Sequence, residues 1–190
     1  MYSPFAVPGS ARQFHDRLYA GEILRINEAP AMLALVEHTR AMLEEALHPW
    51  PPTHIHRHLN HEQQAVLFAK CQGAFAGSRE IQGLWRAVIE SLGLEAQALA
   101  CDRLHLRFQP HRDADARASR ARVTATIAFH RDTWGSNLYA QTNWWAPIYP
   151  ITAGRTFAIY PNLWQRALRN SSTGSLELKE MLQFPNTPPF

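Results

Sequence analysis

Two side chains with metal-binding chemistry stand two positions apart in the second half of the chain. The stretch FHRDTWGSN, residues 129–137, places His130 and Asp132 directly after the apolar, β-branched run VTATIAF, residues 123–129. Residues i and i+2 of a strand point to the same side, so this spacing aims an imidazole and a carboxylate at one point. These are two of the three ligand types in the facial triad that holds non-haem Fe(II). The alternative is that the pair is only the polar end of a strand.

The sequence pattern around this pair predicts helices in the first half of the chain and strands in the second. Apolar residues recur with helical spacing over 29–47, a second helix is predicted to begin at Asn60 with Gln63 as its capping-box partner, and a third begins at Ser78 and ends at Gly93. Alternating or β-branched runs then predict strands at 103–108, 123–129, 139–149 and 155–160. The predicted fold is α+β in a single domain, 1–190, with a mainly helical part over 1–99 and a β core over 100–190.

Two other groups of polar residues offer weaker candidates. The stretch HIHRHLNHE contains His54, His56, His58 and His61, but it lies between prolines and a helix start, where a regular strand is not expected. It is predicted to be mainly a surface loop. A second His-Arg-Asp, residues 111–113, lies in a polar stretch and is also predicted to be a solvated loop.

The stretch from His130 to residue 172 resembles a core segment of the Fe(II)/2-oxoglutarate-dependent dioxygenases, in particular their phytanoyl-CoA-dioxygenase-like branch. The matching features are the strand ending in His-x-Asp, the Trp-rich run NWWAPI, and the run RTFAIYP with basic residues beyond it. The resemblance implies N-terminal helices packed on a double-stranded β-helix, the cupin or jelly-roll barrel. It covers roughly the last ninety residues, which is short for eight strands, so a truncated or reduced barrel is expected.

The resemblance also implies a set of site residues. His130 and Asp132 would hold Fe(II), with 2-oxoglutarate as co-substrate and O₂ as oxidant, for hydroxylation of a small organic molecule. Arg166 or Arg169 would bind the distal carboxylate of 2-oxoglutarate, because a guanidinium suits a bidentate carboxylate contact. Asn143 would line the pocket and orient the substrate or co-substrate. The family's third ligand is a late His, but no His follows His130, and Tyr160 stands at the expected place.

This departure leaves three functions open. The first is an active iron, 2-oxoglutarate-dependent oxygenase, with Tyr160 as a ligand, as a donor to metal-bound water or as plain lining. The second is a catalytically inactive β-helix that serves as a binding or scaffold protein. The third is an enzyme that uses a different divalent metal, held by His130, Asp132 and a histidine such as His105 or His111.

The composition of the chain indicates which classes of partner to expect. The formal net charge is +3 and the hydrophobic content is 46%, and no apolar run is long enough to span a bilayer. A membrane is therefore not expected as a partner. A nucleic acid is not expected either, because the sequence contains no basic stripe with interleaved aromatic residues. The expected ligand is a small molecule, which the arginines allow to be anionic, and the expected location is cytoplasmic. Cys71 and Cys101 are predicted to be buried thiols and not a redox pair, and the oligomeric state stays open.

Overall fold

The computed structural model describes residues 3–4, 10–27, 29–109, 130–132, 141–153 and 156–168. The chain divides into two compact units. The first, called the helical unit here, comprises Met1–Phe108 and Ala146–Phe157. The second unit comprises Gln109–Trp145 and Ala158–Phe190.

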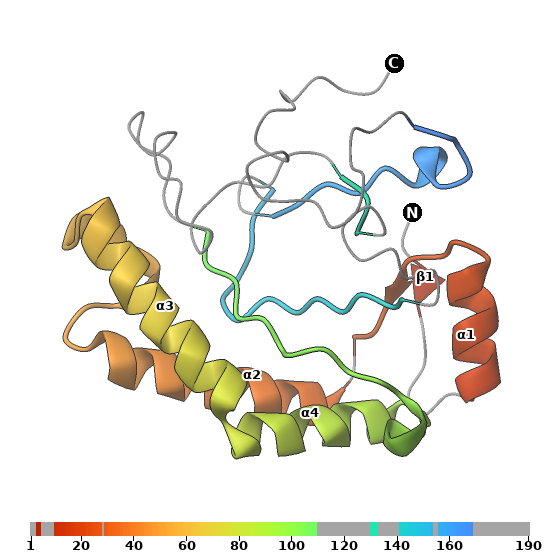
Figure 1. The fold of residues 1–190 in the computed structure, drawn as a ribbon, viewed down its shortest axis with the longest axis horizontal. Coiled ribbons are helices and arrows are strands. Elements are labelled where there is room, and N and C mark those ends of the chain that lie inside the picture. Colours follow the sequence, from red (N-terminus) through yellow and green to blue (C-terminus); the bar gives the residue numbers. More distant parts are fainter. Residues whose placement is uncertain are drawn as a thin grey trace. The chain divides into compact units, whose positions relative to one another are not determined.

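Helices make up most of the described residues (Figure 1). The helical unit contains one short pair of strands, β1 (Ser3–Pro4) and β2 (Leu24–Arg25), which run parallel with Ser3 opposite Leu24. The second unit contributes the 3₁₀ turn η4, Pro161–Leu163. The helices of the helical unit are α1 (Ala11–Tyr19), α2 (Pro30–Leu47), η1 (Pro52–Arg57), α3 (His61–Gly77), α4 (Arg79–Ser91) and η2 (Ala96–Ala98).

Local side-chain chemistry sets the ends of the main helices, as the sequence predicts. At the start of α3, the Asn60 side chain accepts a hydrogen bond from the backbone N–H of Gln63 at 2.9 Å, and the Gln63 side chain accepts one from the backbone N–H of Asn60 at 3.0 Å. This is the predicted capping box. Ser78 caps α4 by accepting from the N–H of Ile81 at 3.2 Å. Gly93, with φ of 74°, follows α4 in the left-handed conformation that suits a helix end.

The hydrophobic core lies where α2 and α4 pack together (Figure 1). The two helices are also joined at the surface, where His38 Nδ1 lies 3.2 Å from Glu80 Oε1. Thr39 of α2 is fully buried, and its hydroxyl donates a hydrogen bond to the carbonyl of Leu35 at 2.7 Å. The core therefore contains no unpaired hydroxyl donor at this position. The apolar side chains that these helices bury are Leu35, Val36, Leu43, Leu47, Ile81, Val88 and Ile89.

The predicted strand at 103–108 is wrong, although its alternation is correct. Leu106 is buried while Arg103 and His105 are exposed, but the segment pairs with no strand in the described part of the chain. It lies instead along α3. The carbonyl of Leu106 accepts a hydrogen bond from the Gln72 side chain at 2.6 Å, and the rings of Phe68 and Phe108 stack with centroids 4.1 Å apart.

The predicted double-stranded β-helix is likewise contradicted, and with it the α+β class. Residues 141–149 and 156–160, predicted to be strands, are described and form no sheet. The predicted strand 123–129 lies outside the described residues. Alternation specifies which way side chains point along an extended segment, but a barrel also needs a neighbour for every strand. Within the described residues, the strands are limited to the β1–β2 pair.

A segment from the second half of the chain completes the helical unit. Residues 146–157 belong to it, and the Arg40 guanidinium of α2 donates through Nε to the carbonyl of Ile148. The same guanidinium lies over the Tyr149 ring, 5.7 Å from its centroid. Burial raises the pKa of the Tyr149 hydroxyl above its ordinary value. Arg40 therefore fastens this segment to α2.

The two cysteines differ in environment. Cys71 is buried in α3, and burial raises the pKa of its thiol. Cys101 is exposed, and its sulfur accepts a hydrogen bond from the indole N–H of Trp85 at 3.2 Å. The expectation of a buried thiol is thus confirmed for Cys71 and wrong for Cys101.

Replacing Gly83 by Ala is expected to stabilise the helical unit by about 0.5–1 kcal/mol, because Ala loses less backbone entropy in a helix than Gly. Gly83 lies inside α4, and a methyl group at this position meets no other atom within 4 Å. Urea unfolding followed by circular dichroism measures the change. Gly93→Ala is the matched control and is expected to destabilise, because its φ of 74° is strained for Ala. Equal effects of the two substitutions would contradict this account.

Candidate functional site

His130 and Asp132, the pair singled out by its spacing, lie together in the second unit. His130 Nε2 is 3.0 Å from Asp132 Oδ1. The two side chains keep 31% and 52% of their surface exposed, respectively, so the pair is open to solvent and to ligands. The residues therefore present an imidazole nitrogen and a carboxylate oxygen side by side at the protein surface.

A hydrogen-bonded chain of amides holds the other oxygen of this carboxylate. The Asn143 side chain donates through Nδ2 to Asp132 Oδ2. The Gln141 side chain in turn donates to Asn143 Oδ1 at 2.6 Å. Asn143 was predicted to line the site, and the structure places it against Asp132. It fixes the orientation of the carboxylate and directs Oδ1 toward His130.

Arg131, which was not predicted to be a site residue, links the pair to a third segment. Its guanidinium donates through one nitrogen to the backbone carbonyls of Leu163 and Arg166, at the end of η4 and just beyond it. Arg131 therefore ties residues 130–132 to residues 163–166. No local pattern in the sequence marks Arg131, because its two partner carbonyls lie more than thirty residues further along the chain.

The remaining predicted site residues have different settings. Tyr160 is the residue immediately before η4 and is 46% exposed. Arg166 is exposed, and its backbone carbonyl is one of the two that Arg131 holds. Arg169, the other predicted carboxylate-binding residue, lies outside the described residues, as do His111 and Asp113.

The histidine cluster of the first half lies partly in a short helix. His54 and His56 belong to the 3₁₀ helix η1, which buries Ile55 and stays otherwise largely at the surface. The rings of His54 and His56 are 6.4 Å apart, and that of His58 stacks on Trp50. In the described ranges, no three His, Cys, Asp or Glu side chains form a group that could hold a metal ion. The predicted loop is thus partly a 3₁₀ helix.

His105 has a carboxylate neighbour of its own in the helical unit. Its Nε2 lies 3.6 Å from Asp102 Oδ2, and the two side chains are 77% and 91% exposed, respectively. The pKa of Asp102 is lowered, first by the backbone N–H of Arg103 and then by His105. The structure thus contains a second, more exposed His–Asp pair, which offers a comparison for His130 and Asp132.

The geometry of His130 and Asp132 suits two kinds of chemistry. Two ligand atoms bound at right angles, each about 2.1 Å from a metal ion, are about 3.0 Å apart. The 3.0 Å between Nε2 and Oδ1 matches that spacing, and Asn143 supplies the kind of supporting hydrogen bond that metal-binding carboxylates receive. The same distance is that of a direct hydrogen bond, in which Asp132 would orient His130 as an acid or base.

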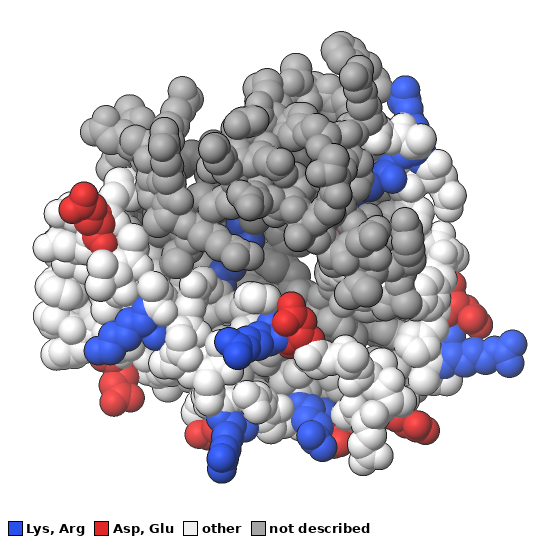
Figure 2. Space-filling view, in the orientation of Figure 1, with Lys and Arg blue, Asp and Glu red and all other residues white. Residues whose placement is uncertain are grey.

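The described surface carries charges of both signs. In the view of Figure 2, basic and acidic side chains are scattered over the described part of the chain and do not gather into one patch of a single sign. None of the helices in the described ranges combines the length and the apolar character needed to cross a bilayer.

Comparison with known proteins adds no relative. No protein-family model, no curated protein and no solved structure matches the chain.

Proposed function

We propose that the chain is an oxidoreductase that binds Fe(II) at His130 and Asp132 and uses 2-oxoglutarate to oxidise a small organic molecule. The observation that carries the proposal is the 3.0 Å separation of His130 Nε2 and Asp132 Oδ1, which suits two neighbouring ligands of one metal ion. When bound, iron and 2-oxoglutarate supply the activation of O₂. The proposal does not depend on a barrel, since three segments joined by side-chain hydrogen bonds make up the site.

The chain's own residues have distinct parts in this proposal. Asn143 holds Asp132 Oδ2, so that Oδ1 and the imidazole face a common point. Arg131 holds the following turn against the pair through two backbone carbonyls. The exposed Arg166 is the candidate for the distal carboxylate of 2-oxoglutarate, since a guanidinium binds a carboxylate through two parallel hydrogen bonds. Two protein ligands leave several positions on the ion for co-substrate and water.

A second candidate is a binding protein without metal. The observation that favours it is that both oxygens of Asp132 already have partners, His130 and Asn143. In that case the pair is a structural hydrogen bond, and the neighbouring segments serve recognition alone. A different divalent metal at the same two ligands is the remaining alternative.

Titration of the purified chain with Fe(II) under nitrogen, and with Mn(II) in a parallel sample, tests the proposal. One ion per chain is expected, and adding 2-oxoglutarate should change the absorption spectrum of the iron-loaded protein. His130→Ala is expected to lower the affinity at least about a hundredfold, because one of the two protein ligands is lost. Exposure of the iron-loaded protein to O₂ should consume 2-oxoglutarate.

His105→Ala is the matched control, because His105 also lies beside a carboxylate but belongs to the helical unit. It is expected to bind metal like the unchanged chain. Binding that survives His130→Ala but not His105→Ala would overturn the assignment of the site. If the unchanged chain binds neither ion, the metal-free candidate replaces the proposal. Tight zinc binding without iron-dependent turnover would support the alternative metal.

A further inference from the structure

The outward face of α3 exposes a large apolar side chain between two charged ones. The helix buries Gln64, Phe68, Cys71 and Phe75. Its opposite side carries Val66, which is 74% exposed, followed by the exposed small residues Ala69 and Gly73. In Figure 2 the surface over α3, at the left of the view, is largely free of charged side chains between one acidic and one basic group.

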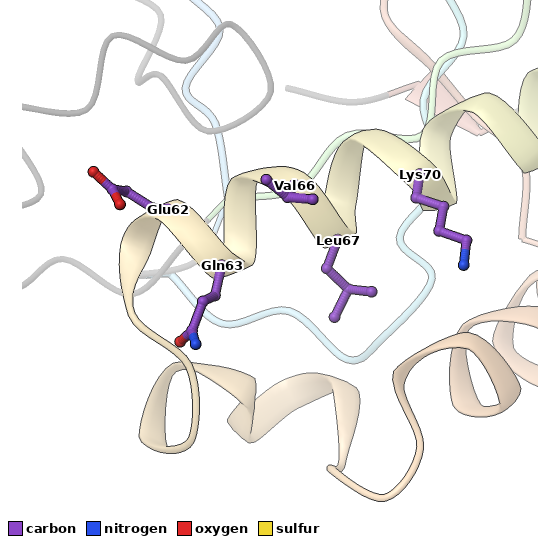
Figure 3. Close-up of a pocket in the computed structure, with 5 residues that line it drawn as sticks. All are labelled: Glu62, Gln63, Val66, Leu67 and Lys70. Atoms are coloured by element: carbon purple, nitrogen blue, oxygen red, sulfur yellow. The ribbon is translucent and has the colours of Figure 1, made fainter.

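Glu62, Val66 and Lys70 form a row along this face. They are spaced four residues apart, so they lie close to one line on the helix surface, with a rise of about 6 Å from each to the next. The row borders a shallow hollow of about 450 Å³, which Gln63 and Leu67 also line. Figure 3 shows the five side chains along α3, with Glu62 near its first turn and Lys70 at the far end of the row.

The order of the row is self-complementary. It reads acidic, apolar, basic, and Val66 is at its midpoint. Two copies of α3 that cross antiparallel at Val66 bring the Glu62 of each copy level with the Lys70 of the other. A parallel arrangement would instead oppose like charges. A two-fold axis through the midpoint therefore makes two equal ion pairs on either side of one apolar contact, which is the pattern of an isologous interface.

We infer that the Glu62–Val66–Lys70 row of α3 is a homodimer contact, and that its partner is the same row of a second copy, in antiparallel orientation. Val66, at the centre of the row, is 74% exposed and is therefore open to contact with the Val66 of the second copy. The contact is small, so the dimer is expected to dissociate at a Kd on the order of 10 µM. The inference is independent of the metal site.

Sedimentation equilibrium of the full chain over a concentration series tests the inference. Val66→Asp is expected to raise the Kd of the dimer at least tenfold, because it brings two carboxylates together at the axis. Glu62→Lys alone and Lys70→Glu alone are expected to weaken the dimer to a similar extent. The double variant Glu62→Lys/Lys70→Glu should dimerise again, because reversing both charges restores the complementary order.

Mixing the two single variants provides a second measurement, in which each variant meets a partner of opposite charge. One carries only basic and the other only acidic ends of the row, so they should form a heterodimer and not homodimers. Leu33→Asp is the control, because Leu33 is an exposed apolar residue of α2 outside the row. A chain that stays monomeric up to about 200 µM would overturn the inference. So would a dimer that Val66→Asp leaves unchanged, or one that the double variant fails to restore.

Discussion

Ile81→Ala is expected to destabilise the helical unit by about 2–5 kcal/mol. The Ile81 side chain is 0% exposed and lies on α4 in the contact with α2, which is the most extensive contact between helices of the unit. Removing three carbons there loses their transfer from water and leaves a cavity that packed helices close only in part. Urea unfolding at fixed protein concentration, followed by circular dichroism at 222 nm, measures the difference.

Leu33→Ala is the matched control for this prediction. Leu33 is also an aliphatic residue in a helix, but it is 59% exposed. Its truncation is therefore expected to change the free energy of unfolding by less than about 0.5 kcal/mol. A loss below about 1 kcal/mol for Ile81→Ala would mean that the α2–α4 contact is not the stable core of the unit.

Arg131→Met is expected to weaken metal binding about 10–100-fold while leaving both metal ligands in the chain. The guanidinium donates to the carbonyls of Leu163 and Arg166, and a methionine of similar length cannot. The turn at η4 then loses its tie to residues 130–132. Metal titration measures the change in affinity.

Hydrogen exchange gives this prediction a readout that needs no metal. The N–H groups of Leu163, Trp164 and Arg166 donate within the turn, and their exchange should become faster by on the order of tenfold in Arg131→Met. Arg131→Lys should fall between the two, since an ammonium group keeps donors but loses the planar geometry. Arg86→Met, on the exposed side of α4, is the control. Unchanged exchange at η4 would refute the positioning role of Arg131, whereas changed exchange without metal binding would refute only the metal proposal.

The helices could be predicted from the sequence because their determinants are local. The capping box of Asn60 and Gln63, the serine cap at Ser78 and the left-handed Gly93 each act within a few residues of the helix end that they set. The predicted helix at 29–47 is confirmed as α2, Pro30–Leu47. The short helix α1 was not predicted, although the Ser10 hydroxyl caps it by accepting from the N–H of Gln13.

The strand predictions in the second half failed because a segment forms a strand only when a second segment pairs with it through backbone hydrogen bonds. Leu104, Leu106 and Phe108 do share a direction opposite to that of Arg103 and His105, as alternation requires. What covers them is helix α3, through Gln72 and Phe68, which are more than thirty residues away in sequence. No pattern within 103–108 distinguishes a helix from a strand as the neighbour.

In the candidate site, too, the local feature could be predicted from the sequence and the long-range contacts could not. The spacing of His130 and Asp132 led to a pair that the structure places 3.0 Å apart. The partners that fix this pair are not local: Asn143 reaches Asp132 across eleven positions, and Arg131 reaches Leu163 across thirty-two. These contacts depend on how three segments are brought together, which the individual segments do not encode.

The course of the backbone has a consequence for how the protein is made and cut. The chain leaves the helical unit after Phe108, returns to it from Ala146 to Phe157, where Arg40 holds Ile148, and then leaves it again. Neither unit is a continuous piece of the gene, so a stop codon at any one position yields at least one incomplete unit. During synthesis, the helices of the first half must wait for residues 146–157 before the surface around Arg40 closes. Conversely, a single protease cut between residues 109 and 145 leaves two fragments that each carry part of both units, and it separates Arg40 from the segment that contains Ile148.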